Sequence, residues 1–136
     1  MNITHGLLPG QVLQRNAQNK GHVLITGTAK NGALEYRVLK DGKAVGKFTW
    51  TRAGAVEKKR FMLAIGGLPC GGPYQVELRV RYQRKTIDVL IVVDVFVGDI
   101  WIAAGQSNMQ GVGNLVDAPK SHPQVRAFYT RDEWDI

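Results

Sequence analysis

The sequence has little of the features by which disulfide-stapled, redox and membrane proteins are recognised. Its single cysteine, Cys70, cannot form a disulfide within the chain, and the Gly/Pro-rich residues 67–73 around it are typical of a loop rather than of a metal or redox motif. The longest apolar run, residues 89–97, is interrupted by Asp94 and is too short to cross a bilayer. The first ten residues lack a basic region followed by an apolar core, so no signal peptide is predicted. We therefore expect no disulfide framework and no membrane partner.

Acidic residues are also scarce relative to basic ones. The chain carries 18 Lys and Arg against 11 Asp and Glu, and the resulting net charge of +7 raises the question of nucleic-acid binding. The only dense basic run is Lys58-Lys59-Arg60, whereas Arg79 and Arg81 alternate with other residues, as on a solvated strand face. Aromatic side chains are not interleaved with these charges, as stacking platforms for bases would be. We predict no nucleic-acid partner and interpret residues 58–60 as a solvated strand start.

Alternation of apolar and polar residues with a period of two dominates the first hundred positions. Hydrophobic residues make up 44% of the chain, which is enough for a core. Alternating segments separated by turn signals are typical of antiparallel β-structure, and Asp41-Gly42 between two such segments predicts a tight hairpin. We predict a mainly β fold, an antiparallel β-sandwich of immunoglobulin-like or jelly-roll-like type over residues 1–98. The expected strands cover residues 22–29, 34–38, 45–51, 59–65, 74–82 and 86–97.

Two parts of this pattern give more detailed expectations. The Gly/Pro-rich residues 66–73 are expected to end any strand that enters them. Asp94, inside the last strand, is interpreted as an edge residue that faces water rather than as a paired buried acid. Four apolar residues of that strand are expected to share one face because they are two apart: Ile91, Val93, Val95 and Val97.

The pattern changes at Gly98-Asp99. Residues 100–104 are apolar on both faces, which is typical of a strand buried in a parallel sheet. They lead into Gly105-Gln106-Ser107-Asn108-Met109, where Gly105 permits a sharp turn and backbone N–H groups near Ser107 could stabilise an oxyanion. A serine placed there is a candidate nucleophile, although a serine that caps a helix gives the same short pattern. We predict that residues 99–136 form the first strand and the nucleophile loop of an α/β domain.

The block Gly105-Gln106-Ser107-Asn108-Met109 resembles the nucleophile block of SGNH (GDSL-type) hydrolases. More narrowly, it is similar to the carbohydrate esterases grouped with sialate O-acetylesterases and some acetylxylan esterases. Residues 97–101 fit the same pattern, and residues 12–15 and 71–74 resemble the β-sandwich that precedes the catalytic domain in that family. The resemblance implies a β-sandwich followed by the truncated start of an SGNH hydrolase domain.

The same resemblance implies an activity, the hydrolysis of acetyl esters on an O-acetylated carbohydrate. Ser107 would be the nucleophile and, through its backbone N–H, one donor to the oxyanion, while Gln106 and Asn108 would contact the substrate. Such families need no metal and no other cofactor. The resemblance also suggests a secreted or periplasmic location.

Part of the family pattern is missing from the sequence. The Asp-x-x-His pair and the remaining oxyanion residues come later in the family, and Asp117 and His122 are interpreted as polar residues of a surface loop. We therefore expect the N-terminal portion of an esterase, inactive by itself. The alternative is a non-catalytic β-sandwich that binds glycan or packs against a partner, with Trp50, Trp101 and Trp134 as either sugar platforms or core residues.

The apolar residues 100–104 also give an expectation about packing. Without parallel neighbours they would expose an apolar edge, which monomeric proteins avoid. Three outcomes are expected for residues beyond about 99: they continue the last sandwich strand, pair with a second copy of the chain, or are poorly ordered. Self-association through residues 99–136 is therefore among the expected interactions, and a monomer with a well-packed α/β layer there would contradict the argument.

Overall fold

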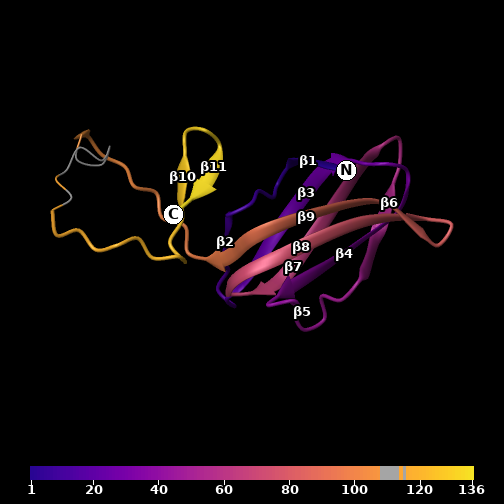
Figure 1. Cartoon of the computed structure of the whole chain (residues 1–136), viewed down its shortest axis with the longest axis horizontal. Helices are drawn as coiled ribbons and strands as arrows, with labels where there is room; N and C mark the ends of the chain where they lie inside the picture. Colours follow the sequence, from indigo (N-terminus) through magenta and orange to yellow (C-terminus); the bar gives the residue numbers. More distant parts are fainter. Residues whose placement is uncertain (108–113, 115) are drawn as a thin grey trace.

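The fold is mainly β and sandwich-like, as the alternation predicts (Figure 1). The computed structural model describes residues 1–107, 114 and 116–136. Eleven strands lie in these residues, and the first nine end at Gly98. The strands are β1 (Asn2–His5), β2 (Val12–Gln14), β3 (Lys20–Thr28), β4 (Gly32–Lys40), β5 (Lys43–Ala44), β6 (Thr51–Val56), β7 (Arg60–Pro69), β8 (Gly71–Tyr82), β9 (Lys85–Gly98), β10 (Ala127–Tyr129) and β11 (Glu133–Asp135).

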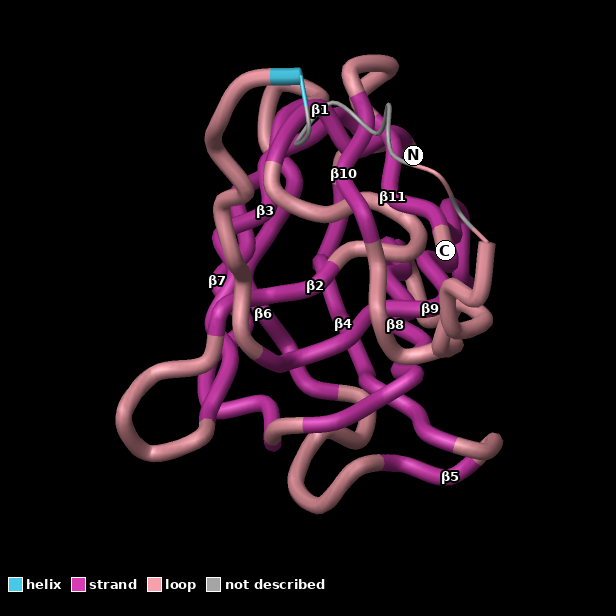
Figure 2. Tube along the Cα trace, turned by 90° about the vertical axis from the view of Figure 1, so that its left-hand side faces the viewer, coloured by secondary structure: helices cyan, strands magenta, loops and turns pink. Residues whose placement is uncertain are grey.

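Two sheets face each other. The larger sheet has the order β2-β9-β8-β4-β5, with β6 also paired to β4, and the smaller has the order β1-β3-β7. All of these pairs are antiparallel except β2 with β9, which is parallel. In the view of Figure 2, β3 and β7 lie on one side of the body and β8 and β9 on the other. The architecture is therefore a two-layer sandwich in which β8 lies inside the larger sheet.

The core lies between the two sheets and is built by the alternating residues. On β8, Tyr74, Val76, Leu78 and Val80 are all buried, whereas Tyr82 at the end of the strand is exposed. Phe61, Leu63 and Ile65 of β7 face them from the smaller sheet, as the spacing predicts. Burial of one face of each sheet against the other provides most of the stability of such a fold.

The hairpin predicted at Asp41-Gly42 is confirmed, but the return strand predicted at residues 45–51 is wrong, because β5 covers only Lys43–Ala44 and residues 45–50 form no strand. Both residues have positive φ, 50° and 75°, and β5 pairs with β4 over only two residues. Gly46, with φ of 52°, ends the pairing, and the chain folds back so that Phe48 enters the core. The N–H of Val38 donates to the carbonyl of Phe48 at 3.0 Å, which holds this excursion against β4.

The basic run at residues 58–60 is confirmed as a strand start only at Arg60, where β7 begins, whereas Lys58 and Lys59 form a turn. Lys58 and Lys59 have φ of 50° and 62°, and Glu57 and Arg60 exchange two backbone hydrogen bonds of 3.1 and 2.9 Å. The turn connects β6 of the larger sheet to β7 of the smaller sheet, and both lysines in it are exposed.

The Gly/Pro-rich residues 66–73 do not end the strands, and this expectation was wrong. β7 continues to Pro69 and β8 begins at Gly71, so the two strands are separated by Cys70 alone. The glycines permit close packing: a Cβ on Gly66 would lie 2.8 Å from Nδ1 of His22, and one on Gly72 would lie 2.8 Å from the carbonyl oxygen of Val95.

The face predicted for the last strand is also wrong, because β9 contains a bulge. Asp94 has φ of 57°, and three steps along β9, from Val92 to Val95, oppose two steps along β8. The extra residue shifts the alternation, so Val92 and Val95 are both buried, whereas Ile91 is 51% exposed. Asp94 itself faces water, as interpreted from the sequence.

Residues 99–136 are here called the C-terminal arm, and its described residues, 99–107, 114 and 116–136, extend beyond one end of the sandwich (Figure 1). Residues 99–105 form no strand, so β9 is not continued and the strand predicted at 100–104 is not formed. Farther along the arm, β10 pairs antiparallel with β11 in a small hairpin. The assignment of the arm to a second domain stays a prediction. In the described part of the chain, no helix is long and apolar enough to cross a membrane.

Candidate functional site

The candidate nucleophile lies on the arm, well exposed to solvent. Ser107 has a 3₁₀ backbone conformation and Gln106 lies in the bend before it. Asn108, the other predicted substrate contact, lies outside the described residues. Ser107 is thus presented by an extended segment, and the sandwich does not cover it.

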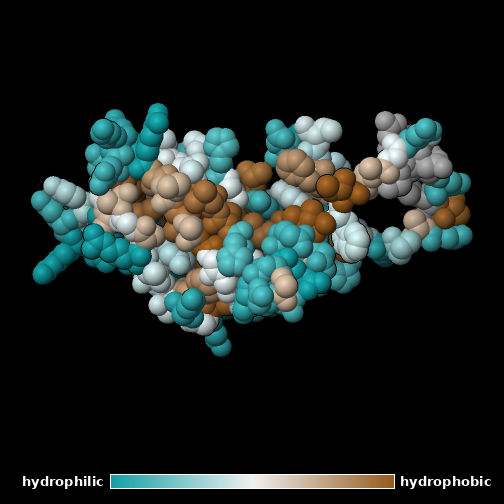
Figure 3. Space-filling view, turned by 180° about the vertical axis from the view of Figure 1, so that it is seen from behind, coloured by the Kyte–Doolittle hydropathy of each residue, from teal (hydrophilic) through white to brown (hydrophobic). Residues whose placement is uncertain are grey.

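The residues that lead to the serine are strongly apolar and strongly exposed. Trp101 and Ile102 are 88% and 91% exposed, and Ile100 is exposed as well. Hydrophobic surface, brown in Figure 3, lies both on the sandwich and along the arm. Large side chains at this exposure are typical of a surface that another protein layer covers.

No catalytic base accompanies the serine among the described residues. Asp117 and His122 are exposed, and no hydrogen bond in the described part of the chain joins either of them to Ser107. Nδ1 of His122 accepts the N–H of Gln124 at 3.2 Å, which closes a local turn. The interpretation of these two residues as a surface loop agrees with this geometry. Within the described residues, no three His, Cys, Asp or Glu side chains gather to hold a metal ion.

A cavity of about 900 Å³ lies between the end of the sandwich and the arm, and Ser107 does not line it. Phe96 and Val97 form its sandwich wall, while Ile100, Phe128 and Trp134 belong to the arm. The lining is mainly apolar, so the cavity has few groups that could recognise the hydroxyls of a sugar. Its chemistry suits the burial of a packed layer better than the binding of a polar ligand.

Arg126 is the main polar side chain over this apolar wall. Its guanidinium lies 4.9 Å from the ring centre of Phe96, and its Nε has no hydrogen-bond partner in the described structure. On the arm side, the rings of Phe128 and Trp134 are 5.3 Å apart. Trp134 therefore packs within the β10–β11 hairpin and does not stand free as a sugar platform.

Trp50 has a different environment, on the outer face of the larger sheet. Its ring lies under the guanidinium groups of Arg37 and Arg79, at 4.7 and 3.8 Å from the ring centre. Each arginine is also paired with an acid of the neighbouring strand, Arg37 with Glu77 at 2.8 Å and Arg79 with Glu35 at 2.7 Å. Trp50 is thus neither a core residue nor an open platform for a sugar, because the guanidinium groups of Arg37 and Arg79 already lie over its ring.

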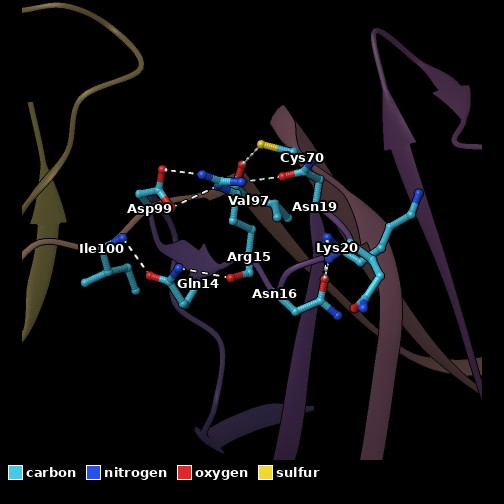
Figure 4. Close-up of polar contacts among 10 residues, drawn as sticks. Gln14, Arg15, Asn16, Asn19, Lys20, Cys70, Val97, Asp99 and Ile100 are labelled. Carbon is cyan, nitrogen blue, oxygen red and sulfur yellow. Dashed lines mark hydrogen bonds and ion pairs between the residues drawn. The ribbon is translucent and has the colours of Figure 1, made fainter.

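A polar cluster at the base of the arm was missed by the sequence analysis (Figure 4). Arg15, just after β2, forms two ion-pair contacts with Asp99, Nε to Oδ1 at 2.9 Å and Nη2 to Oδ2 at 3.0 Å. Its remaining Nη1 donates to Oδ1 of Asn19. No signal in the sequence indicated that Arg15 and Asp99 meet, because they are far apart in the chain.

The charges of this cluster stabilise each other. The hydrogen bond and the positive charge of Arg15 hold the pKa of Asp99 below its usual range, and the same contacts raise the pKa of Arg15. Because the pKa of Asp99 is lowered, the ion pair stabilises the folded state above the ordinary pKa of aspartate. This stabilisation is lost as the pH falls through the lowered pKa. The cluster is therefore intact at neutral pH.

Comparison with known proteins adds no further assignment. No protein-family model matches the chain, and no curated protein matches it. What the fold and the site define is a β-sandwich protein with an exposed serine on an apolar arm. The family resemblance of residues 105–109 rests on the residues themselves.

We expect the chain to self-associate through the exposed apolar residues of the arm. Ile102→Asp should weaken the association at least tenfold, because it places a charge where apolar surface would be buried. Sedimentation velocity over a range of concentrations measures this. The matched control is Leu24→Asp, which changes an exposed apolar residue of the sandwich and should leave the association unchanged. A chain that is monomeric at every concentration would contradict the prediction.

Proposed function

We propose that the chain is the N-terminal portion of a serine carbohydrate O-acetylesterase of the SGNH type and that Ser107 is its nucleophile position. The observation that carries the proposal is the exposed apolar run directly before this serine, residues 100–104. Full burial of a large apolar side chain is worth about 1.5–3 kcal/mol, so exposure of Trp101 and Ile102 forgoes several kcal/mol. Such a run is what the first strand of an α/β domain would contain before its neighbouring strands cover it.

The order of elements along the chain supports the same proposal. A sandwich-like fold ends at Gly98, and the apolar run and the serine follow within nine residues. The cavity beside the run is lined by apolar groups of both the sandwich and the arm, as a space filled by a packed layer would be. This is the order of parts that the resemblance of residues 105–109 implies.

The proposed reaction is ester hydrolysis in two steps. Oγ of Ser107 bonds to the acetyl carbonyl carbon while a histidine takes the serine proton and passes it to the departing sugar oxygen. The backbone N–H of Ser107 is one of the donors that stabilise the oxyanion. Water, activated by the same histidine, then attacks the acetyl-enzyme and releases acetate. The proposal assigns this role to a histidine other than His122, whose Nδ1 accepts the N–H of Gln124 in a local turn.

The proposal makes opposite predictions for the isolated chain and for the protein expressed from its complete gene. The 136-residue chain should not hydrolyse an aryl acetate above the background rate, because no base lies beside Ser107 in the described structure. The complete gene product should hydrolyse an aryl acetate and release acetate from an O-acetylated sugar. Colorimetric release of the phenol and enzymatic measurement of acetate check the two substrates.

Two results would overturn the proposal. One is a complete gene product that hydrolyses neither substrate, which would favour the alternative of a non-catalytic sandwich that binds glycan or packs against a partner. The other is hydrolysis by the isolated chain that persists when Ser107 is replaced by alanine, because the activity would then come from another group.

A further inference from the structure

At the base of the arm, the backbone pairing of β2 with β9 is extended by a hydrogen bond from a side chain. β2 runs parallel to the end of β9, with Gln14 opposite Gly98. The N–H of Arg15 donates to the carbonyl of Gly98 at 2.8 Å, and the N–H of Ile100 donates to Oε1 of Gln14 at 2.8 Å. A side chain thus provides the next hydrogen bond at the point where the backbone ladder ends.

The arginine in this cluster is held from the sandwich side as well. Asn19, which accepts from Arg15, lies in the turn between β2 and β3, and its carbonyl accepts the N–H of Cys70 at 3.0 Å. The sulfur of Cys70 in turn donates to the carbonyl of Val97 at 3.2 Å. The guanidinium of Arg15 is therefore held by residues of the sandwich as well as by Asp99 (Figure 4).

The Arg15–Asp99 pair is better suited to orienting the arm than to stabilising the fold. Both side chains are exposed, and exposed ion pairs contribute little to the free energy of folding. A two-point contact between a planar guanidinium and a carboxylate, however, fixes the orientation of one group relative to the other. Residues 99–105 have no strand partner, so the contacts of Asp99 and Ile100 are the polar contacts that hold the start of the arm to the sandwich. Further along the arm, Arg126 lies over Phe96 and Trp134 lies beside Gly10.

We propose that Arg15 and Asp99, together with Gln14, form a joint that sets the direction in which the arm carrying Ser107 leaves the sandwich. Arg15 is then a positioning residue, since it acts on the serine through Asp99 and the arm. The consequence for catalysis rests on the proposed function, whereas the consequence for the direction of the arm does not.

The direction of the arm can be measured as a distance between two labels. Spin labels are attached at Met62→Cys, on the outer face of β7, and at Ala104→Cys, on the arm, in a Cys70→Ser background that keeps a donor toward Val97. The labelled chain is diluted with unlabelled chain, so that pairs between molecules do not contribute. Pulsed electron paramagnetic resonance should give one narrow distance distribution.

Variants of the joint should broaden this distribution without unfolding the sandwich. Arg15→Gln and Asp99→Asn should each at least double its width, while Arg15→Lys, which keeps the charge but loses the two-point contact, should broaden it less. The midpoint of thermal unfolding should move little in all three. The matched control is Arg131→Gln, which breaks an exposed arginine–glutamate pair in the β10–β11 hairpin and should leave the width unchanged.

If the distance distribution keeps its width in both Arg15→Gln and Asp99→Asn, the proposed joint is wrong. If one of these variants does not fold, the width measured in the other variant decides. In the complete gene product, Arg15→Gln should lower kcat about tenfold to a hundredfold with little change in KM, because a displaced nucleophile reacts slowly. Broadening in a protein without esterase activity would support the joint and refute the proposed function. Esterase activity with unchanged widths would do the reverse.

Discussion

Replacing Ser107 with alanine is expected to lower the proposed esterase activity of the complete gene product by about 10³-fold or more. In the proposed mechanism the hydroxyl oxygen of Ser107 forms the acetyl-enzyme, and alanine has no group that can replace it. The backbone N–H at this position remains, so substrate binding and part of the oxyanion stabilisation survive. The loss should therefore fall on kcat, with KM changed little, as measured by steady-state hydrolysis of an aryl acetate.

The chain offers a matched control for this substitution. Ser121 is also exposed and also lies on the arm, so Ser121→Ala makes the same chemical change at a position with no proposed role. Its activity should equal that of the unchanged protein. If Ser107→Ala retained full activity, or if Ser121→Ala lost as much, Ser107 would not be the nucleophile.

Burial could be predicted from the sequence where apolar and polar residues alternate without interruption. β8 is the example: Tyr74, Val76, Leu78 and Val80 alternate with polar residues in the sequence and are all buried in the structure. The rule works there because a strand with one face on a core has a period of two and nothing disturbs it. The mainly β, sandwich-like class follows from several such segments.

Prediction failed where one or two residues depart from extended geometry. In β9, one residue with positive φ at Asp94 shifts the alternation, so that Val92 is buried and Ile91 is not. At residues 58–59, two lysines adopt the left-handed conformation that glycine or asparagine would have signalled. Residue type does not mark the two lysines, and although aspartate is enriched at positive φ, Asp94 alone does not predict a bulge. The turn at Lys59 is held by Ala29 and Asn31, which are distant in sequence.

The candidate site shows the same difference between local and non-local features. The serine block is local in sequence, so its resemblance to a nucleophile block can be read from the sequence, and the role of Ser107 stays a prediction. The joint is not local, because Arg15 and Asp99 are 84 positions apart and meet only through parallel pairing of β2 with β9. The exposure of residues 100–104 likewise depends on what packs beside them, and their apolar character predicted a buried strand that the chain does not form.

The largest effect on stability is expected for Leu78→Ala. Leu78 lies in the middle of β8, pairs with Tyr36 and Leu90 on the two neighbouring strands, and is 0% exposed. Removing its branched end loses the free energy of apolar transfer and leaves a cavity that the paired strands on both sides cannot close. The free energy of unfolding should fall by about 2–5 kcal/mol, measured by urea denaturation of the 136-residue chain.

The same substitution at an exposed leucine separates this cavity from any effect of the residue change itself. Leu24→Ala, at a position 55% exposed on β3, should lower the free energy of unfolding by no more than about 0.5 kcal/mol. Both positions are in strands, so the intrinsic preference of alanine affects them alike and the difference reports burial. Equal losses at the two positions would mean that Leu78 is not held between the two sheets, and the sandwich core described above would be wrong.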